Sequence, residues 1–194
     1  MTETALIKID QPYASAICQG IELDEQATAL LQDNPTTADF IQQLIEQRLY
    51  PDVVRFLAHA LPKREATWWA CLCARNNLSD KTSANEIKAI ELAEAWVYRP
   101  TEENRKLTLP AAEITAYKSA ASWAAMAAFW SGNDISPVVH AIVPPNEKLF
   151  AKAVVGAVIL AATQSEADKI DDNYQLFLRQ GINIASGGDG RSVQ

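Results

Sequence analysis

Two histidines and three cysteines are the residues of this sequence best suited to metal binding or nucleophilic catalysis, namely His59, His140, Cys18, Cys71 and Cys73. A structural zinc site needs about four ligands at workable spacing. The pattern around His59 is that of an amphipathic helix, whereas His140 falls in a loop flanked by prolines. We therefore interpret both histidines as structural residues and expect neither a metal nor a cofactor.

A Cys–His nucleophile pair would require Cys71 or Cys73 to lie beside His59, with a third group orienting the imidazole. The order of the predicted helices permits this arrangement. Both cysteines, however, fall in an apolar helical stretch, where cysteine usually packs as a small hydrophobic residue. An odd number of cysteines also gives no disulfide framework, so we expect three reduced thiols.

Other candidates for chemistry are also better explained without catalysis. Glu91 and Glu94 are three residues apart on a predicted helix and could pair for acid–base work, but a solvated helix face is favoured. The GGDG run at residues 187–190 lacks the Lys-Ser/Thr ending of a phosphate loop, and residues 186–194 are predicted to form a flexible tail. We expect the protein not to be an enzyme. An enzyme with an unrecognised site, in a cleft between two repeats, is kept as an alternative.

Tryptophan offers a different kind of functional signal, because aromatic side chains dominate protein interfaces as well as cores. All five tryptophans fall on predicted helices beside apolar residues, which favours the core. Trp68 and Trp69 are about 100° apart around a helix, so they point in different directions and one of them suits a groove. The candidate partner-binding residues are Trp68, Trp69, Trp123 and Trp130.

Composition limits the classes of function. The chain has 194 residues, 48% of them hydrophobic, and a net charge of −7. These values are ordinary for one globular domain, which we place at residues 1–185. Nucleic-acid binders carry a basic patch, so the acidic balance predicts no nucleic-acid partner. The first ten residues, MTETALIKID, do not resemble a signal peptide, and we expect a cytoplasmic protein.

The elements that must position these residues are helices, and we predict an all-α bundle, or stacked helical hairpins, of about seven to nine helices. Hydroxyl caps predict helix starts at Thr36, Ser83 and Thr101. Pro110 is expected to open a long alanine-rich helix that ends at Trp130. A last helix is predicted to be capped by Ser165 and to end at Gly181.

The stretch from Leu149 to Ala162 is apolar on every side except at Lys152. A helix without a polar face belongs in a core or in a membrane. This stretch holds about a dozen apolar residues, and a membrane span needs about twenty. We therefore predict a helix buried at the centre of the core, and no membrane association.

The order of elements occurs twice, which predicts an internal duplication with units at residues 62–109 and 110–180. The run KREATWWACLCA is echoed by YKSAASWAAMAAFW, with Trp69 set against Trp123. The run EIKAIELAEAWV is likewise echoed by LFAKAVVGAVILAA. Convergence of alanine-rich amphipathic helices would explain the same echo, and both explanations stay open. In either case, the helix pairs must stack to bury their apolar faces.

Four runs together resemble an uncharacterised family of bacterial proteins, a domain of unknown function; they are FLAHALPKREATWWACLCAR, AEAWVYRPTEENR, AAFWSGNDISP and VPPNEKLFAKAVVGAVILAA. Some members of that family are encoded beside type VI secretion genes. The resemblance implies an accessory or effector-handling role in bacterial secretion, with another protein as partner, and it supplies no catalytic residues. An immunity-like inhibitor that binds a toxin through its acidic surface is the alternative. Neither the partner's identity nor the oligomeric state follows from the sequence.

Overall fold

The computed structural model describes residues 5–136 and 142–191, and the elements in these ranges are helical, as predicted. His140 lies outside the described residues. Ten α-helices and one 3-10 turn occur in the described ranges: α1 Ala14–Ile17, α2 Glu25–Ala29, α3 Thr37–Glu46, α4 Tyr50–Ala60, α5 Lys63–Asn76, α6 Ala84–Tyr98, α7 Glu102–Ile114, α8 Ala120–Trp130, α9 Leu149–Thr163, η1 Ala167–Lys169 and α10 Ile170–Ala185.

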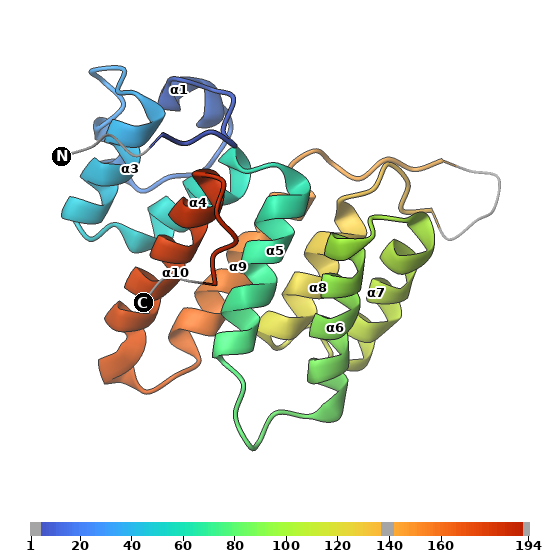
Figure 1. Cartoon of the computed structure of the whole chain (residues 1–194). Helices are drawn as coiled ribbons and strands as arrows, with labels where there is room; N and C mark the ends of the chain where they lie inside the picture. The colour runs from blue at the N-terminus through green and yellow to red at the C-terminus, as the bar shows by residue number, and fades with distance from the viewer. Residues whose placement is uncertain (1–4, 137–141, 192–194) are drawn as a thin grey trace.

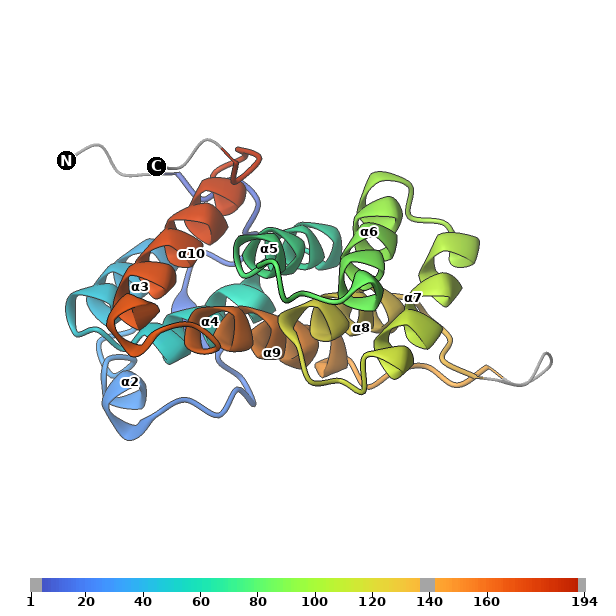
Figure 2. The same cartoon turned by 90° about the horizontal axis from the view of Figure 1, so that it is seen from below.

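The long helices form two layers, which Figure 2 shows in cross-section. Helices α4, α9 and α8 make one layer, and α10, α5 and α6 make the other. Helix α7 closes one end of the bundle by packing against α6 and α8. The short helices near the N-terminus lie at the opposite end, where α1 and α3 pack against α4 (Figure 1).

Three of the predicted helix starts are confirmed. They could be predicted from sequence because each depends on contacts within a few residues. The Thr36 hydroxyl accepts the backbone N–H of Asp39 at the start of α3, and Thr101 plays the same role for α7. Ser83 and Glu86 form a reciprocal capping box at the start of α6. Such caps satisfy backbone N–H groups that have no partner within the helix.

The predicted helix from Pro110 to Trp130 is wrong. Pro110 lies inside α7, which Thr101 has already started, and its side chain is exposed. Helix α7 ends at Ile114 because Ala116 and Tyr117 have φ angles of 53° and 57°, a left-handed conformation that no helix continues. Helix α8 then begins after Ser119, whose hydroxyl accepts the N–H of Ser122.

The predicted ends of the last helix are also wrong. Helix α10 starts at Ile170 without a side-chain cap, because the Ser165 hydroxyl instead donates to the carbonyl of Ala162 and accepts from Asn173. Helix α10 then continues through Gly181 to Ala185. The absence of a side chain at Gly181 leaves space for the Trp69 ring, since a Cβ there would come within 2.9 Å of it.

The apolar helix α9 is buried on all sides but one. It packs against α8, α5, α4 and α10, as expected of a central helix. Its remaining face carries half-buried Val155, Gly156, Ile159 and Leu160, together with exposed Lys152, so the expectation of a helix enclosed on every side is corrected. Within the described ranges, no helix is long and apolar enough to cross a membrane.

The contacts between helices repeat when α5, α6 and α7 are exchanged for α8, α9 and α10. The pair α5–α6 corresponds to α8–α9, and the pair α6–α7 corresponds to α9–α10. The cross-contacts α6–α8 and α7–α8 likewise correspond to α9–α5 and α10–α5. This pattern supports an internal duplication. It places the boundary between the units after α7, whereas residues 109 and 110 fall inside that helix.

Candidate functional site

Trp69 is a core residue and is withdrawn as a candidate for partner binding. Its side chain is 0% exposed, and its indole N–H donates to the backbone carbonyl of Phe177 in α10 at 2.8 Å. A buried tryptophan normally satisfies its polar N–H in this way. The adjacent Trp68 lies on another side of α5 and is half-buried, as the 100° separation of the two side chains requires.

Trp68 is covered by the chain that follows α10. Its indole N–H donates to the carbonyl of Asp189 at 2.7 Å, and the guanidinium of Arg191 lies 4.7 Å from its ring centroid. The ring of Tyr98 is 5.8 Å away, and its hydroxyl accepts from Arg191. Residues 186–191 thus have defined contacts, which differs from the flexible tail predicted for 186–194, of which 192–194 lie outside the described residues. These contacts leave Trp68 little free surface for a partner.

Trp123 and Trp130 form a half-buried aromatic pair beside the open face of α9. Their ring centroids are 6.3 Å apart, and the ring of Tyr117 lies 6.2 Å from that of Trp123. The Trp123 indole N–H donates to the carbonyl of Tyr117 at 3.0 Å. Gly156 of α9 lies under this ring, because a Cβ at that position would be 3.3 Å from it. Trp123 and Trp130 therefore stay as candidates for partner binding.

The structural counterpart of Trp123 is Trp68, not Trp69. Each follows a fully buried hydroxyl residue, Thr67 in α5 and Ser122 in α8. Each is half-buried, and each donates its indole N–H to a carbonyl in the segment after the third helix of the other unit. The structure therefore pairs Trp123 with Trp68, one residue away from the Trp69 that the sequence echo pairs with it.

Helix α7 carries exposed apolar side chains that the sequence interpretation missed. Leu107 is 47% exposed and Ile114 is 66% exposed, with exposed Pro110 between them. The two residues are seven apart and so lie on one side of the helix. This spacing could have revealed them, but the predicted boundary at 109 and 110 divided the helix that carries both.

The outer side of α6 and α7 differs from the corresponding side of α9 and α10 in how it is covered by other described helices. In the second unit, α4 packs against α9 and α10, which correspond to α6 and α7. Among the described helices, none packs against both α6 and α7 in the place that α4 would occupy there. We call this surface the α6–α7 face; α7, one of its two helices, carries exposed Leu107 and Ile114.

The residues considered for chemistry do not converge. Cys71 and Cys73 are fully buried, and burial raises the pKa of both thiols, so neither forms a thiolate readily. Cys18 is half-buried, and burial raises its pKa to about 11. Glu94 is paired with Arg75 and Glu91 with Lys88, so the two carboxylates serve separate ion pairs. In residues 5–136 and 142–191, no group of three or more potential ligands could hold a metal ion.

Replacing Gly156 by leucine is expected to lower the free energy of unfolding by about 1–3 kcal/mol, because the new side chain must displace the Trp123 ring. Alanine at the same position adds only the Cβ, 3.3 Å from the ring, and serves as a milder control. Urea unfolding followed by circular dichroism measures both variants. Equal stability of the leucine variant and the wild type would show that Trp123 is not held against α9.

Comparison with known proteins gives a family but no function. The model of a family of unknown function, DUF6931, matches residues 40–185. The match runs from within α3 to the last residue of α10, so it includes α4 and both three-helix units. No curated protein and no solved structure matches the chain.

Proposed function

The chain belongs to DUF6931, a family of unknown function, and we propose that it is a non-enzymatic interaction protein that binds a helix of another protein. The observation that carries this proposal is the α6–α7 face. Its counterpart on α9 and α10 is filled by α4, and α7, one of the two helices of the face, exposes Leu107 and Ile114. Exposed apolar groups that gather on one side of a soluble domain typically mark a binding surface.

The packing of α4 indicates what kind of segment would fit. Helix α4 is amphipathic and presents buried Val53, Val54 and Leu57 to its neighbours. Its Tyr50 ring lies 5.7 Å from the ring of Tyr174 in α10. By analogy, a partner helix on the α6–α7 face would place an apolar stripe over Leu107 and Ile114. Docking of an amphipathic helix on a groove is a common mode of peptide recognition.

The resemblance described above supports a narrower version of the proposal. In that version, the protein is a cytoplasmic accessory or effector-handling factor of a bacterial type VI secretion system. An immunity-like inhibitor is the second candidate, supported by the net charge of −7, which suits a basic toxin. The neighbouring genes distinguish the two: secretion genes alone favour the accessory role, and rescue of cells from an adjacent toxin favours the inhibitor.

Replacing Leu107 and Ile114 together by glutamate is expected to weaken capture of the partner at least about tenfold, because two charges would have to be buried at the contact. Both side chains are largely exposed, so the stability of the free protein should change little. Quantitative pull-down with the tagged full chain, followed by titration of the purified partner, gives the change in affinity.

Ile142 provides the matched control, because it is 80% exposed and lies outside the α6–α7 face. Its replacement by glutamate should leave capture unchanged. The face is rejected as the binding surface if the double variant captures the partner as well as the wild type does. Loss of capture on replacing Trp123 and Trp130 by alanine would then place the surface on α8 and α9 instead.

A further inference from the structure

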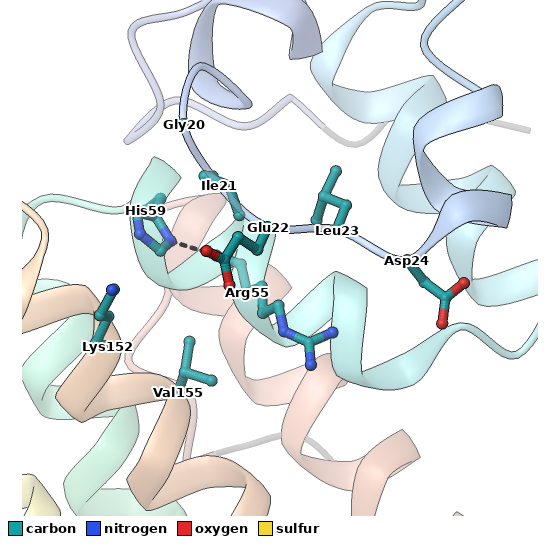
Figure 3. A pocket seen from close by; sticks show the side chains of 9 residues that line it. All are labelled: Gly20, Ile21, Glu22, Leu23, Asp24, Arg55, His59, Lys152 and Val155. Atoms are coloured by element: carbon teal, nitrogen blue, oxygen red, sulfur yellow. Dashed lines mark hydrogen bonds between the residues drawn. The ribbon is translucent and has the colours of Figure 1, made fainter.

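A cavity of about 380 Å³ lies between α4, α9 and the loop that joins α1 to α2. Figure 3 shows the loop passing over α4, with α9 below the opening. This volume lies within the range of small-molecule sites in proteins. The lining residues are Gly20, Ile21, Glu22, Leu23, Asp24, Arg55, His59, Lys152 and Val155.

One imidazole nitrogen of His59 is already used, and the other has no hydrogen-bond partner among residues 5–136 and 142–191. The Nδ1 atom lies 2.7 Å from the backbone carbonyl of Arg55, the contact drawn as a dashed line in Figure 3. A carbonyl oxygen can only accept, so Nδ1 carries the hydrogen and Nε2 is the remaining nitrogen. Burial lowers the pKa of His59, the hydrogen bond to Arg55 opposes this, and the nearby Lys148 and Lys152 lower the pKa further.

Lys152 is the only charged residue of α9, and its side chain reaches toward the His59 ring in Figure 3. Within the part of the chain that the structure describes, no carboxylate forms an ion pair with it. Arg55, by contrast, is held by Asp52 at 2.9 Å. Lys152 is therefore one donor for a bound anion, and His59 Nε2 becomes a second donor when the imidazole is protonated.

The other charged groups at the cavity come from two elements. The loop contributes Glu22 and Asp24, and Lys148 precedes α9, where its ammonium donates to the carbonyl of Gln19. The Asp24 carboxylate points away from His59 in Figure 3. Glu22 lies closer, and neither residue forms an ion pair with Lys152. Glu22 is thus the one carboxylate placed to compete with an anion in the cavity.

We propose that this cavity binds a small organic carboxylate, with one oxygen accepting from Lys152 Nζ and the other from protonated His59 Nε2. Two single donors match the two oxygens of a carboxylate, whereas a phosphate would leave a further oxygen without a partner. The apolar part of the ligand would lie against Ile21, Leu23 and Val155. This site is separate from the α6–α7 face, which lies at the other end of the bundle (Figure 1).

The pKa of His59 is the direct readout, because an anion beside the imidazole stabilises its protonated form. Saturating glutarate should raise that pKa by about half a unit or more, measured from the ring C–H resonances as the pH is varied. The chain has two histidines, and the His59→Asn variant identifies the signals of His59. Ionic strength is held constant with sodium chloride.

Substitutions of single charged residues test whether glutarate binds in this cavity. Lys152→Gln should weaken glutarate binding at least about tenfold, and Glu22→Gln should strengthen it by removing the competing carboxylate. Lys106→Gln is the matched control, because it removes the same charge from an exposed position on α7 and should change nothing. Lys152 is itself exposed, so its variant should fold normally.

Two outcomes would overturn the proposal. An unchanged pKa of His59 in glutarate, or the same change in the Lys152→Gln variant, would show that no anion binds between the two residues. Inorganic phosphate is titrated in parallel. If it raises the pKa as strongly at an equal concentration, the assignment to carboxylates is wrong. Loss of partner capture in the α6–α7 variants has no bearing on this result, since the glutarate titration requires no partner.

Discussion

Replacing Trp69 by alanine is expected to lower the free energy of unfolding by about 3–5 kcal/mol. The side chain is fully buried between α5 and α10, and it satisfies the carbonyl of Phe177 with its N–H. Gly181 has no Cβ that could fill the resulting cavity, and Leu57 would have to move into it. Domains have a total stability of about 5–15 kcal/mol, so this loss is a large fraction of the total. Because Trp69 is the fully buried member, its variant should be the least stable of the tryptophan substitutions.

Trp68→Ala is the matched control, because it removes the same side chain from the next position of the same helix. Trp68 is half-buried and contacts Tyr98 and Arg191, so we expect a loss of about 1–2 kcal/mol. Urea unfolding followed by circular dichroism avoids comparing proteins that differ in tryptophan fluorescence. If Trp68→Ala is the more destabilising of the two, the assignment of Trp69 to the core is wrong.

The two neighbouring tryptophans show how far the sequence could predict the site. Helical geometry alone requires that Trp68 and Trp69 point in different directions, and this is what the structure has. Which of them is buried depends on α10, more than 100 residues further along the chain, because Phe177 and Gly181 form the wall against Trp69. No local pattern around residue 68 or 69 carries that information.

Helix ends show that a hydroxyl residue alone does not decide where a helix begins. Thr36, Ser83 and Thr101 begin helices through contacts made within three residues, and these starts could be predicted. Ser165 has the same residue type, but its hydroxyl is taken by Ala162 and Asn173, and the helix begins later. Helix α7 ends at Ile114, just before left-handed Ala116 and Tyr117, and the carbonyl of Tyr117 accepts from the Trp123 indole.

The spacing of Leu107 and Ile114 places them on one side of α7, but residue types alone cannot show that this side is left uncovered. Leu107 and Ile114 are ordinary apolar residues of an amphipathic helix, and in most bundles such residues face a neighbour. Both are exposed, and among the described helices none packs on α6 and α7 as α4 packs on α9 and α10. A candidate site of this kind follows from comparing the two halves of the fold, and therefore needs the packing of all seven helices from α4 to α10.

Replacing Arg105 by methionine is expected to lower the free energy of unfolding by about 2–4 kcal/mol, although methionine keeps much of the side chain's length. Arg105 lies in α7 and its side chain is 1% exposed. Its guanidinium donates to the carbonyls of Phe129 and Asp134 at 2.7 and 2.6 Å, and to the Glu102 carboxylate at 2.7 Å. It thus joins the end of α8 to α7, and methionine leaves both carbonyls without that donor.

Arg75→Met is the control for this prediction. Arg75 also donates two hydrogen bonds to a carboxylate, that of Glu94, but its side chain is 36% exposed, and it donates to no backbone carbonyl in the described part of the chain. Its loss should cost less than about 1 kcal/mol. Arg105→Lys should recover only part of the stability, because one ammonium cannot reproduce the planar arrangement of donors. Equal denaturant midpoints for Arg105→Met and Arg75→Met would show that Arg105 acts as an ordinary ion pair and does not hold α8 to α7.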